Sequence, residues 1–446
     1  MTTLHLLLFL LMACGRAQNS KLAKASPTEE KLSFSAAQTG KSSTSFPLIH
    51  INAKCSPFRN SNSTLLTTML DSIKGDVQRY RAITRVATRF TIQEDTDVPL
   101  TSKSGDYIIN LGFGTPQQSF YMSLDTGSDI SWIPCALCTD CTGNIFDPSN
   151  SPTFQFLSCS SETCQALGST PNCGNYNCSI TQTYGDGSEV KELMSTDSLA
   201  VGSQSMPDFI FGCAKARTGL ITSTPGLVGF GRDSLSFLSQ TANLFQETFS
   251  YCLPSPESTG CLALGKAALS SPGLQFTSLL SNDANPSFYY VGLNGISVGE
   301  DLVDVPAIDQ SSGDGTIIDS GTFITRLVEP VYGSVRDSFV RQLSNLSRAA
   351  SYSIFDACFN FPPGDVEVPQ MTLHFDNNVD VALQQINVLI PVDEQGSVQC
   401  LAFAPPPGDP SVSMVSILGS YQQHNFRVVY DIPGSRLGIA PESCDG

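Results

Sequence analysis

The sequence predicts an all-β protein with two similar lobes and a cleft between them. From residue 105 onward, short runs rich in Val, Ile, Phe, Tyr and Thr are separated by Gly, Pro, Asn and Ser, which is typical of strands joined by turns. The chain also repeats one pattern at long range, and its 446 residues leave room for more than one core. Two copies of one plan indicate two lobes related by a pseudo-two-fold axis.

The strands and helices of this body can be placed from their residue patterns. Strands are expected in the segments DYIINLGFGTP, FIFGCA, FYYVGLNGISVG, GTIIDSGTFIT and FRVVYDIPGSRLGIA. Helical spacing occurs briefly in EPVYGSVRDSFVRQL, from Glu329 to Leu343. We therefore expect a β-rich body with few helices.

The repeat has an aspartate at its centre. FYMSLDTGSDISW around Asp125 returns as GTIIDSGTFIT around Asp319, and GLVGFG at 226–231 returns as SILGSY at 416–421. Each half thus has an apolar strand, then Asp-(Thr/Ser)-Gly, then an apolar-apolar-Gly element. One such tripeptide is most often a plain turn. Two in the same context predict a shared site.

Two carboxylates near a two-fold axis share one proton, because both cannot ionise a few ångströms apart. One can then accept a proton from water while the other donates to or polarises a carbonyl, which gives hydrolysis without a covalent intermediate. Gly127 and Gly321 let backbone N–H groups approach the carboxylates. The hydroxyls that can donate to them belong to Thr126, Ser128, Ser320 and Thr322.

A leader precedes this body. Residues 1–17 have an apolar run and small residues at a cleavage position, which predicts a secretory signal peptide although a basic n-region is missing. We expect a secreted, extracellular or apoplastic protein, with vacuole and plastid as alternatives. No later stretch has the length of a membrane span.

Residues 18–104 are basic, and the rest of the chain is acidic. Twelve Lys and Arg against seven Asp and Glu give +5 for 18–103, whereas eleven against thirty-four give −23 for 105–446. Residues 67–90 have the spacing of an amphipathic basic helix, whose cationic face is either solvated or docked on the body. Asn-X-Ser/Thr sequons occur at Asn62, Asn177 and Asn345 and predict surface glycans.

Thirteen of the fifteen cysteines lie from Cys135 onward. This density predicts disulfides in an oxidising compartment. The spacing of Cys135, Cys138 and Cys141 also permits a metal or iron–sulfur site, but the fourth ligand with a following proline is missing. We expect disulfides, with no metal and no cofactor.

The chain resembles a pepsin-like aspartic protease of the plant nepenthesin- and nucellin-like group over about residues 105–446. The resemblance is carried by the two Asp triads, by Trp132, by TYGDGS at 183–188 and by twelve cysteine positions. It implies the pepsin-like acid protease fold, with 105–275 as the N-terminal lobe and 276–446 as the C-terminal lobe. It further implies that residues 18–104 are a propeptide, removed in acid somewhere between about Phe90 and Gly105.

The resemblance also implies roles for single residues. Asp125 and Asp319 would be the catalytic pair, with Ser128 and Thr322 bonded to their outer oxygens. Thr126 and Ser320 would tie the two loops together. Tyr184 would lie on a flap over the substrate, with its hydroxyl near the indole N–H of Trp132. The further substrate-binding residues would be Gly185, Asp186 and Phe323.

Six disulfides are implied among the twelve matching cysteines, including 135 with 138, 141 with 213, 159 with 178 and 164 with 173. Three residues depart from the family pattern. Cys261 is an extra cysteine, which either stays a thiol or pairs with Cys55. Phe323 replaces a Thr or Ser, and Glu192 replaces a flap glycine.

We therefore expect a secreted aspartic-type endopeptidase, made as a zymogen and acting as a monomer on proteins or peptides at acidic pH. Two alternatives remain. One is an inhibitor or binding protein on the same fold. The other is a DNA-binding plastid protease, because KCSPF and the basic helix resemble the leader of a chloroplast-nucleoid aspartic protease. The charge of −23 argues against nucleic-acid binding by the body, and without a spanning stretch we expect no membrane partner.

Overall fold

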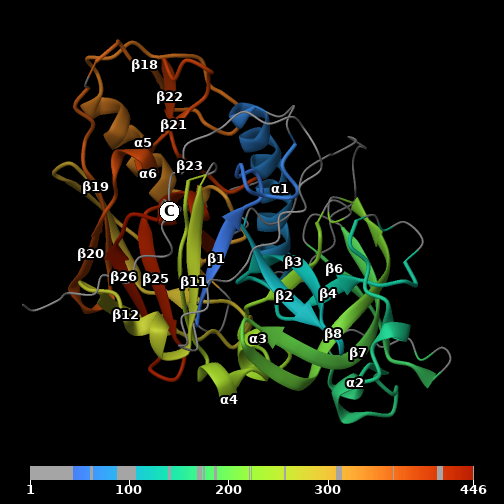
Figure 1. Ribbon diagram of the computed structural model, residues 1–446. Helices are drawn as coiled ribbons and strands as arrows, with labels where there is room; N and C mark the ends of the chain where they lie inside the picture. The colour runs from blue at the N-terminus through green and yellow to red at the C-terminus, as the bar shows by residue number, and fades with distance from the viewer. Residues whose placement is uncertain are drawn as a thin grey trace, which may run out of the picture.

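Two strand-rich lobes lie side by side in the computed structural model, with the leader helix between them (Figure 1). The structure describes residues 44–60, 64–87 and 107–444, apart from short gaps at 139–140, 142, 168–172, 174–175, 185–187, 220, 222–223, 256–257, 308–313, 365 and 409–414. The predicted signal peptide, the sequon at Asn62 and the region of predicted leader cleavage lie outside the described residues.

The first half of the described chain contributes β1 (Ser45–His50), β2 (Tyr107–Phe113), β3 (Gln118–Asp125), β4 (Trp132–Pro134), β5 (Gln155–Phe156), β6 (Ser179–Thr183), β7 (Glu189–Val201), β8 (Gln204–Thr218), β9 (Leu227–Gly229), β10 (Thr248–Cys252), β11 (Thr259–Leu264) and β12 (Gln275–Leu280). The second half contributes β13 (Tyr290–Val291), β14 (Leu293–Val298), β15 (Asp301–Asp304), β16 (Gly315–Ile318), β17 (Thr325–Arg326), β18 (Cys358–Asn360), β19 (Met371–Phe375), β20 (Val379–Ala382), β21 (Leu389–Pro391), β22 (Val398–Leu401), β23 (Phe403–Ala404), β24 (Val415–Leu418), β25 (Phe426–Asp431) and β26 (Arg436–Pro441). The helices are α1 (Leu65–Ala87), α2 (Glu162–Ala166), α3 (Phe237–Gln240), α4 (Ala242–Phe245), α5 (Val331–Gln342), α6 (Gln385–Val388) and α7 (Ser420–Gln423).

The predicted all-β, two-lobed architecture is confirmed. Nineteen of the described strands belong to one hydrogen-bonded network, with β15-β14-β19-β20 and β18-β22-β21 as smaller sheets. The antiparallel pairs β10–β25 and β12–β26 join strands from the two halves of the chain. The helix expected at 329–343 is α5. No described helix is long and apolar enough to span a membrane.

The leader is part of the folded structure. Its strand β1 pairs antiparallel with β11, where Pro47 lies opposite Cys261, and also with β2. The helix predicted at 67–90 is α1, of which residues up to 87 are described. Its buried positions are Met69, Ile73, Asp76, Tyr80 and Ile83. These follow the 3.6-residue period of a helix face, so the apolar face of α1 is docked on the body. Lys74 and Arg81 are exposed, so most of the described cations are solvated, and Arg79 alone among these three is largely covered.

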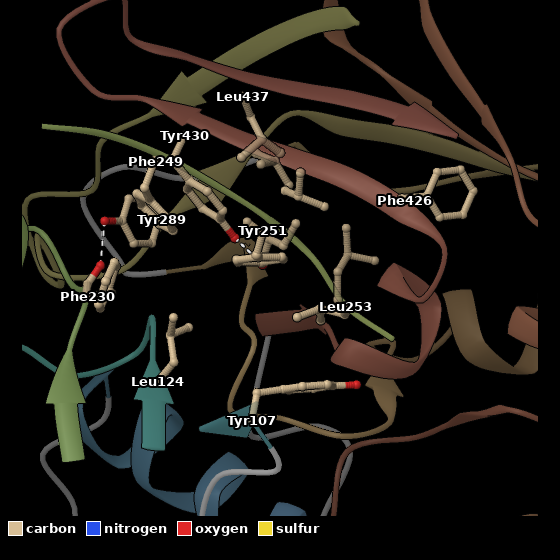
Figure 2. Close-up of a cluster of buried hydrophobic side chains, with 14 of the residues drawn as sticks. Tyr107, Leu124, Phe230, Phe249, Tyr251, Leu253, Tyr289, Phe426, Tyr430 and Leu437 are labelled. Atoms are coloured by element: carbon tan, nitrogen blue, oxygen red, sulfur yellow. Dashed lines mark hydrogen bonds between the residues drawn. The ribbon is translucent and has the colours of Figure 1, made fainter. Parts of the chain in front are cut away.

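An aromatic cluster supports the first aspartate-bearing segment (Figure 2). Phe249 and Tyr430 stack at 4.3 Å across the β10–β25 pair. The Tyr289 hydroxyl donates to the carbonyl of Phe230 at 2.6 Å, and the Phe230 N–H donates to the carbonyl of Asp125 at 2.7 Å. Because buried backbone groups must be paired, this chain of bonds fixes the backbone at Asp125.

Six disulfides form as expected, but the four pairings that the resemblance implied are wrong. The observed pairs are Cys135–Cys213, Cys138–Cys141, Cys159–Cys173, Cys164–Cys178, Cys252–Cys444 and Cys358–Cys400. The error has a physical reason: several cysteines lie within a few residues of one another in sequence, and only the strand register selects the partner. Cys135, for example, directly follows β4, and Cys213 lies in β8, which pairs in parallel with β4.

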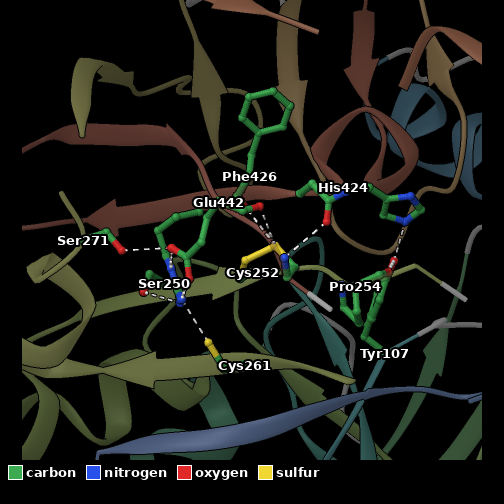
Figure 3. The surroundings of a disulfide bond; sticks show 12 residues. Tyr107, Ser250, Cys252, Pro254, Cys261, Ser271, His424, Phe426 and Glu442 are labelled. Atoms are coloured by element: carbon green, nitrogen blue, oxygen red, sulfur yellow. Dashed lines mark hydrogen bonds and ion pairs between the residues drawn. A yellow bond between two sulfur atoms is a disulfide. The ribbon is translucent and has the colours of Figure 1, made fainter. Parts of the chain in front are cut away.

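The extra cysteine Cys261 does not pair with Cys55. It lies opposite Cys252 in the β10–β11 register, beside the Cys252–Cys444 disulfide (Figure 3). Its sulfur accepts a hydrogen bond from Nη2 of Arg427 at 3.0 Å. The Cys55 sulfur instead contacts the hydroxyl of Thr259 at 3.3 Å.

Candidate active site

The two aspartates lie at the ends of corresponding strands in the two lobes. Asp125 is the last residue of β3, which runs parallel to β9, and Asp319 follows β16, which runs parallel to β24. Of the apolar-apolar-Gly elements of the sequence repeat, the first lies in β9, and the second is formed by the end of β24 and the following Gly419. The repeat therefore encodes one local plan twice: a strand ending in aspartate beside a parallel strand that ends at a glycine.

Each carboxylate accepts the same two kinds of hydrogen bond. The Gly127 N–H donates to Oδ1 of Asp125 at 3.0 Å, and the Ser128 hydroxyl donates to Oδ2 at 2.6 Å. In the other lobe, Gly321 N–H donates to Oδ1 of Asp319 at 3.0 Å and Thr322 donates to Oδ2 at 2.6 Å. Both carboxylates are nearly fully buried, so these donors supply the stabilisation that water would otherwise give.

A cross-link between the lobes holds the two loops together. The Ser320 N–H donates to Oγ1 of Thr126 at 2.9 Å. The Thr126 hydroxyl in turn lies 3.3 Å from Oδ1 of Asp319 and 3.3 Å from the Ser320 hydroxyl. The side chain of one loop thus reaches the carboxylate of the other, so the two triads form one site.

The guanidinium of Arg79, from α1, lies between the two aspartates. Its Nε donates to Oδ2 of Asp319 at 2.6 Å, and Nη2 donates to Oδ1 at 2.8 Å. Nη2 also donates to Oδ1 of Asp125, and Nη1 donates to Oδ2 at 3.4 Å. All four carboxylate oxygens therefore face one arginine, in the two-pronged geometry that guanidinium and carboxylate groups favour.

The sequence did not predict this position for Arg79. The helical pattern placed Arg79 among the cations of the exposed surface, whereas its side chain is only 17 % exposed. Gly127 and Gly321 leave the space that it occupies, because a Cβ would lie 2.4 Å from Nη2 at the first glycine and 2.6 Å from Cζ at the second. A signal was present: Asp76 occupies a position of the apolar stripe of α1, and Arg79, three residues later, lies on the same side of the helix.

The electrostatics of the site follow from this contact. Burial raises the pKa of Asp319, but the charge and hydrogen bonds of Arg79, with those of Thr322 and Gly321, outweigh burial and lower it below 3.8. Burial lowers the pKa of Arg79, and the two aspartates more than reverse this, so its pKa lies well above the ordinary value. Arg79 and Asp319 are thus held in their charged forms.

The flap elements lie over the first lobe. The indole N–H of Trp132 donates to the hydroxyl of Tyr184 at 2.7 Å, and both belong to one apolar cluster. Gly185 and Asp186, expected to bind substrate, lie outside the described residues. Phe323 packs edge-on against Tyr421 with ring centroids 5.4 Å apart.

In this form the Arg79 side chain of α1 occupies the space between the two aspartates. A cavity of about 600 Å³ lies elsewhere and is lined by Phe361 and its neighbours, by the 395–399 segment and by Gln385. It contains neither aspartate and takes no part in the site.

Glu192 is buried in β7 beneath the flap. The side chain is fully buried, and neither carboxyl oxygen has a hydrogen-bond partner within the described part of the chain. It lies over Gly212, where a Cβ would come within 1.8 Å of Oε2. Burial raises the pKa of Glu192 well above the ordinary value, so the carboxyl takes up a proton on folding.

We expect Glu192→Gln to flatten the pH dependence of stability. Above the unfolded pKa of about 4.3, the folded wild-type protein keeps a proton that the unfolded chain releases, so its stability falls by about 1.4 kcal/mol per pH unit until the raised folded pKa is reached. Glutamine cannot ionise, so the stability of the variant does not fall with pH through this side chain. Denaturant unfolding between pH 4 and 7 measures both slopes, and parallel curves for the two proteins would contradict a buried, neutral Glu192.

Comparisons with known proteins agree with this geometry. The chain matches the family models described as "Xylanase inhibitor N-terminal" over residues 107–266 and "Xylanase inhibitor C-terminal" over residues 288–441. It is 38 % identical over 428 residues to "Aspartyl protease family protein 2" of Arabidopsis thaliana, covering 90 % of this chain and 86 % of that protein. It is 39 % identical over 378 residues to "Aspartic proteinase nepenthesin-1" of Nepenthes gracilis, covering 82 % of this chain and 84 % of that protein.

Among solved structures, Basic 7S globulin from soybean is similar in fold, with a TM-score of 0.62 and 24 % identity over 76 % of this chain and 94 % of that chain. The two family models together match most of the body. The matches to the two relatives cover most of each relative's length as well as most of this chain. The chain therefore belongs to the pepsin-like aspartic protease family of plants.

Proposed function

We propose that the protein is a secreted aspartic endopeptidase, made as a latent precursor and active at acidic pH. The observation that carries this proposal is the bridging of Asp125 and Asp319 by one guanidinium of the leader. Each aspartate has its own N–H and hydroxyl donors, so the pair is complete, while Arg79 occupies the position where a substrate and a water molecule would meet it.

The mechanism follows once α1 has left. Without the cation, two adjacent carboxylates hold one proton between them. The ionised aspartate takes a proton from water as the water oxygen attacks the carbonyl carbon of the scissile peptide, and the protonated aspartate donates its proton to the carbonyl oxygen. The tetrahedral intermediate then collapses: the C–N bond breaks, the leaving amine takes the proton that came from water, and one hydroxyl returns a proton to the other aspartate. The carboxylates are held in place by the N–H and hydroxyl donors of Gly127, Ser128, Gly321 and Thr322. Thr126 keeps the two loops at a fixed separation.

A second candidate function is binding without turnover, because the matching family models are described by the words "Xylanase inhibitor". The two aspartates with their full set of donors favour the protease. The purified precursor, acidified and given a generic protein substrate, distinguishes the two. Hydrolysis that the aspartic-protease inhibitor pepstatin abolishes supports the protease, whereas a folded protein without turnover supports the binding function.

We expect acid to release the leader. Binding of Arg79 requires both carboxylates to be ionised, whereas the free pair holds one proton, so the leader releases a proton when it binds. The leader therefore binds most tightly above the upper pKa of the free carboxylate pair. Its affinity falls as the pH decreases below that value, toward the lowered pKa that Asp319 has in the bound form, which lies below 3.8. Hydrogen exchange of α1 in the first seconds after acidification measures this. Protection that stays constant from pH 7 to pH 3 would contradict the mechanism.

A further inference from the structure

The leader helix has a second polar anchor, one turn before Arg79. The carboxylate of Asp76 is 2 % exposed and accepts hydrogen bonds from two successive backbone N–H groups of the body. Phe323 N–H donates to Oδ1 at 2.6 Å, and Ile324 N–H donates to Oδ2 at 2.6 Å. Successive N–H groups that converge on one point form an anion-binding concavity. The body therefore binds a carboxylate a few residues after Asp319.

A buried arginine lies next to this concavity. Arg326, in β17, is 1 % exposed, and its Nη1 donates to the carbonyl of Pro405 at 3.0 Å. Its Nε and Nη2 have no hydrogen-bond partner among the described residues. Burial lowers the pKa of Arg326, and the charge of Asp76 is the largest of the influences that raise it. The leader carboxylate is thus the anion that partly compensates this cation.

Removal of α1 leaves this region without its anion. The two backbone N–H groups that Asp76 had bound would then lack an acceptor, a few residues after Asp319, and Arg326 would lose the charge of Asp76. An uncompensated buried charge and unpaired N–H groups are costly, so a carboxylate of similar position is bound favourably there.

We propose that Phe323 N–H, Ile324 N–H and Arg326 form a substrate subsite that recognises an acidic side chain close to the scissile bond. The subsite rests on the proposed protease function. Asp76 and Arg79 are three residues apart on a helix, about 4.5 Å along its axis. An extended substrate covers that distance in one to two residues, at about 3.3 Å each. The acidic residue therefore lies within about two residues of the cleaved peptide bond.

Matched peptides test the subsite with the mature wild-type enzyme. Peptides that differ only by Glu, Gln or Lys at one position, moved through the two residues on each side of the scissile bond, are compared by kcat/KM at about pH 5, where glutamate is mostly ionised. At one position we expect Glu to exceed Gln by about tenfold or more, as for hydrogen bonds to a charged group, and Lys to be worst. Equal rates for Glu and Gln at every position would overturn the subsite and leave the protease function intact. No hydrolysis of any peptide would overturn both.

A substitution then assigns the preference to Arg326. In Arg326→Gln the ratio of Glu to Gln rates is expected to fall to about one, and in Arg326→Lys part of it should remain because a cation is kept. The ratio is internal to each protein, so a lower yield of folded variant does not affect it. Arg348→Gln, an exposed arginine of the same half of the chain, is the matched control and should keep the wild-type ratio. A full preference in Arg326→Gln would contradict the assignment.

Discussion

Asp125→Asn is expected to lower the kcat of the acid-activated enzyme by about 10³-fold or more while the protein stays folded. An amide keeps the shape of the side chain: its oxygen can still accept from the Gly127 N–H, and the Ser128 hydroxyl can rotate to accept from its NH2 group. It cannot accept a proton from water, however, and general acid–base catalysis alone contributes about 10²–10⁴-fold. Hydrolysis of a fluorogenic peptide by wild-type and variant protein, both freed of the leader by the same added protease, measures the loss.

The control is the same chemical change elsewhere. Asp304→Asn removes an exposed carboxylate at the end of β15 and should leave the rate unchanged. Because the effects of residues that act as a unit are not additive, the double variant Asp125→Asn, Asp319→Asn should be little worse than either single one. An Asp125→Asn enzyme with more than about a tenth of the wild-type kcat would exclude the paired-carboxylate mechanism, in which one general base carries the step.

Arg79→Met should make the uncleaved precursor active. Methionine keeps the length of the side chain and the helical propensity of α1 but removes the charge that binds both aspartates. Loss of one partner of a buried ion pair costs about 3–5 kcal/mol. We therefore expect the leader to bind about 10²–10⁴-fold more weakly, at about 1.4 kcal/mol per tenfold, and the precursor to cleave a peptide at a pH where the wild-type precursor is latent.

Lys74→Met provides the comparison on the same helix. Lys74 pairs with Asp71 at 3.5 Å on the exposed face, with about half of its side chain in solvent, so latency should be unchanged. Mass spectrometry of the same samples shows whether the leader is still attached. An Arg79→Met precursor that is as latent as wild type would mean that the apolar contacts of α1, rather than the ion pairs, close the site.

The sequence was sufficient for the architecture and for the pairing of Asp125 with Asp319. Both depend on local patterns that repeat: an apolar strand ending in Asp-(Thr/Ser)-Gly and, much later, an apolar-apolar-Gly strand. The structure shows why both elements are needed, since β9 and β24 run parallel to the aspartate-bearing strands. Docking of the leader helix was one of two alternatives that the sequence allowed, because the charge of the leader is opposite to that of the body.

Details that depend on distant partners could not be predicted. The orientation of Arg79 is fixed by contacts with residues 46 and 240 positions away, and no periodicity distinguishes it from the solvated cations of the same helix. The disulfide pairs were predicted wrongly for the same reason. The four cysteines at 159, 164, 173 and 178 permit several pairings, and the fold selects Cys159–Cys173 and Cys164–Cys178. The buried state of Glu192 and Arg326 also breaks the rule that charges stay in solvent. Both departures lie beside the cleft, where such exceptions are expected.

The central claim is that a complete catalytic pair is held latent by the leader. The most direct test follows one sample of wild-type precursor through a drop from pH 7 to pH 3, with peptide hydrolysis and leader attachment measured at the same times. We predict no hydrolysis at pH 7, and hydrolysis that rises together with leader release and is abolished by pepstatin. Full activity of the intact precursor at pH 7, or release of the leader from a folded body that then hydrolyses nothing, would contradict the account.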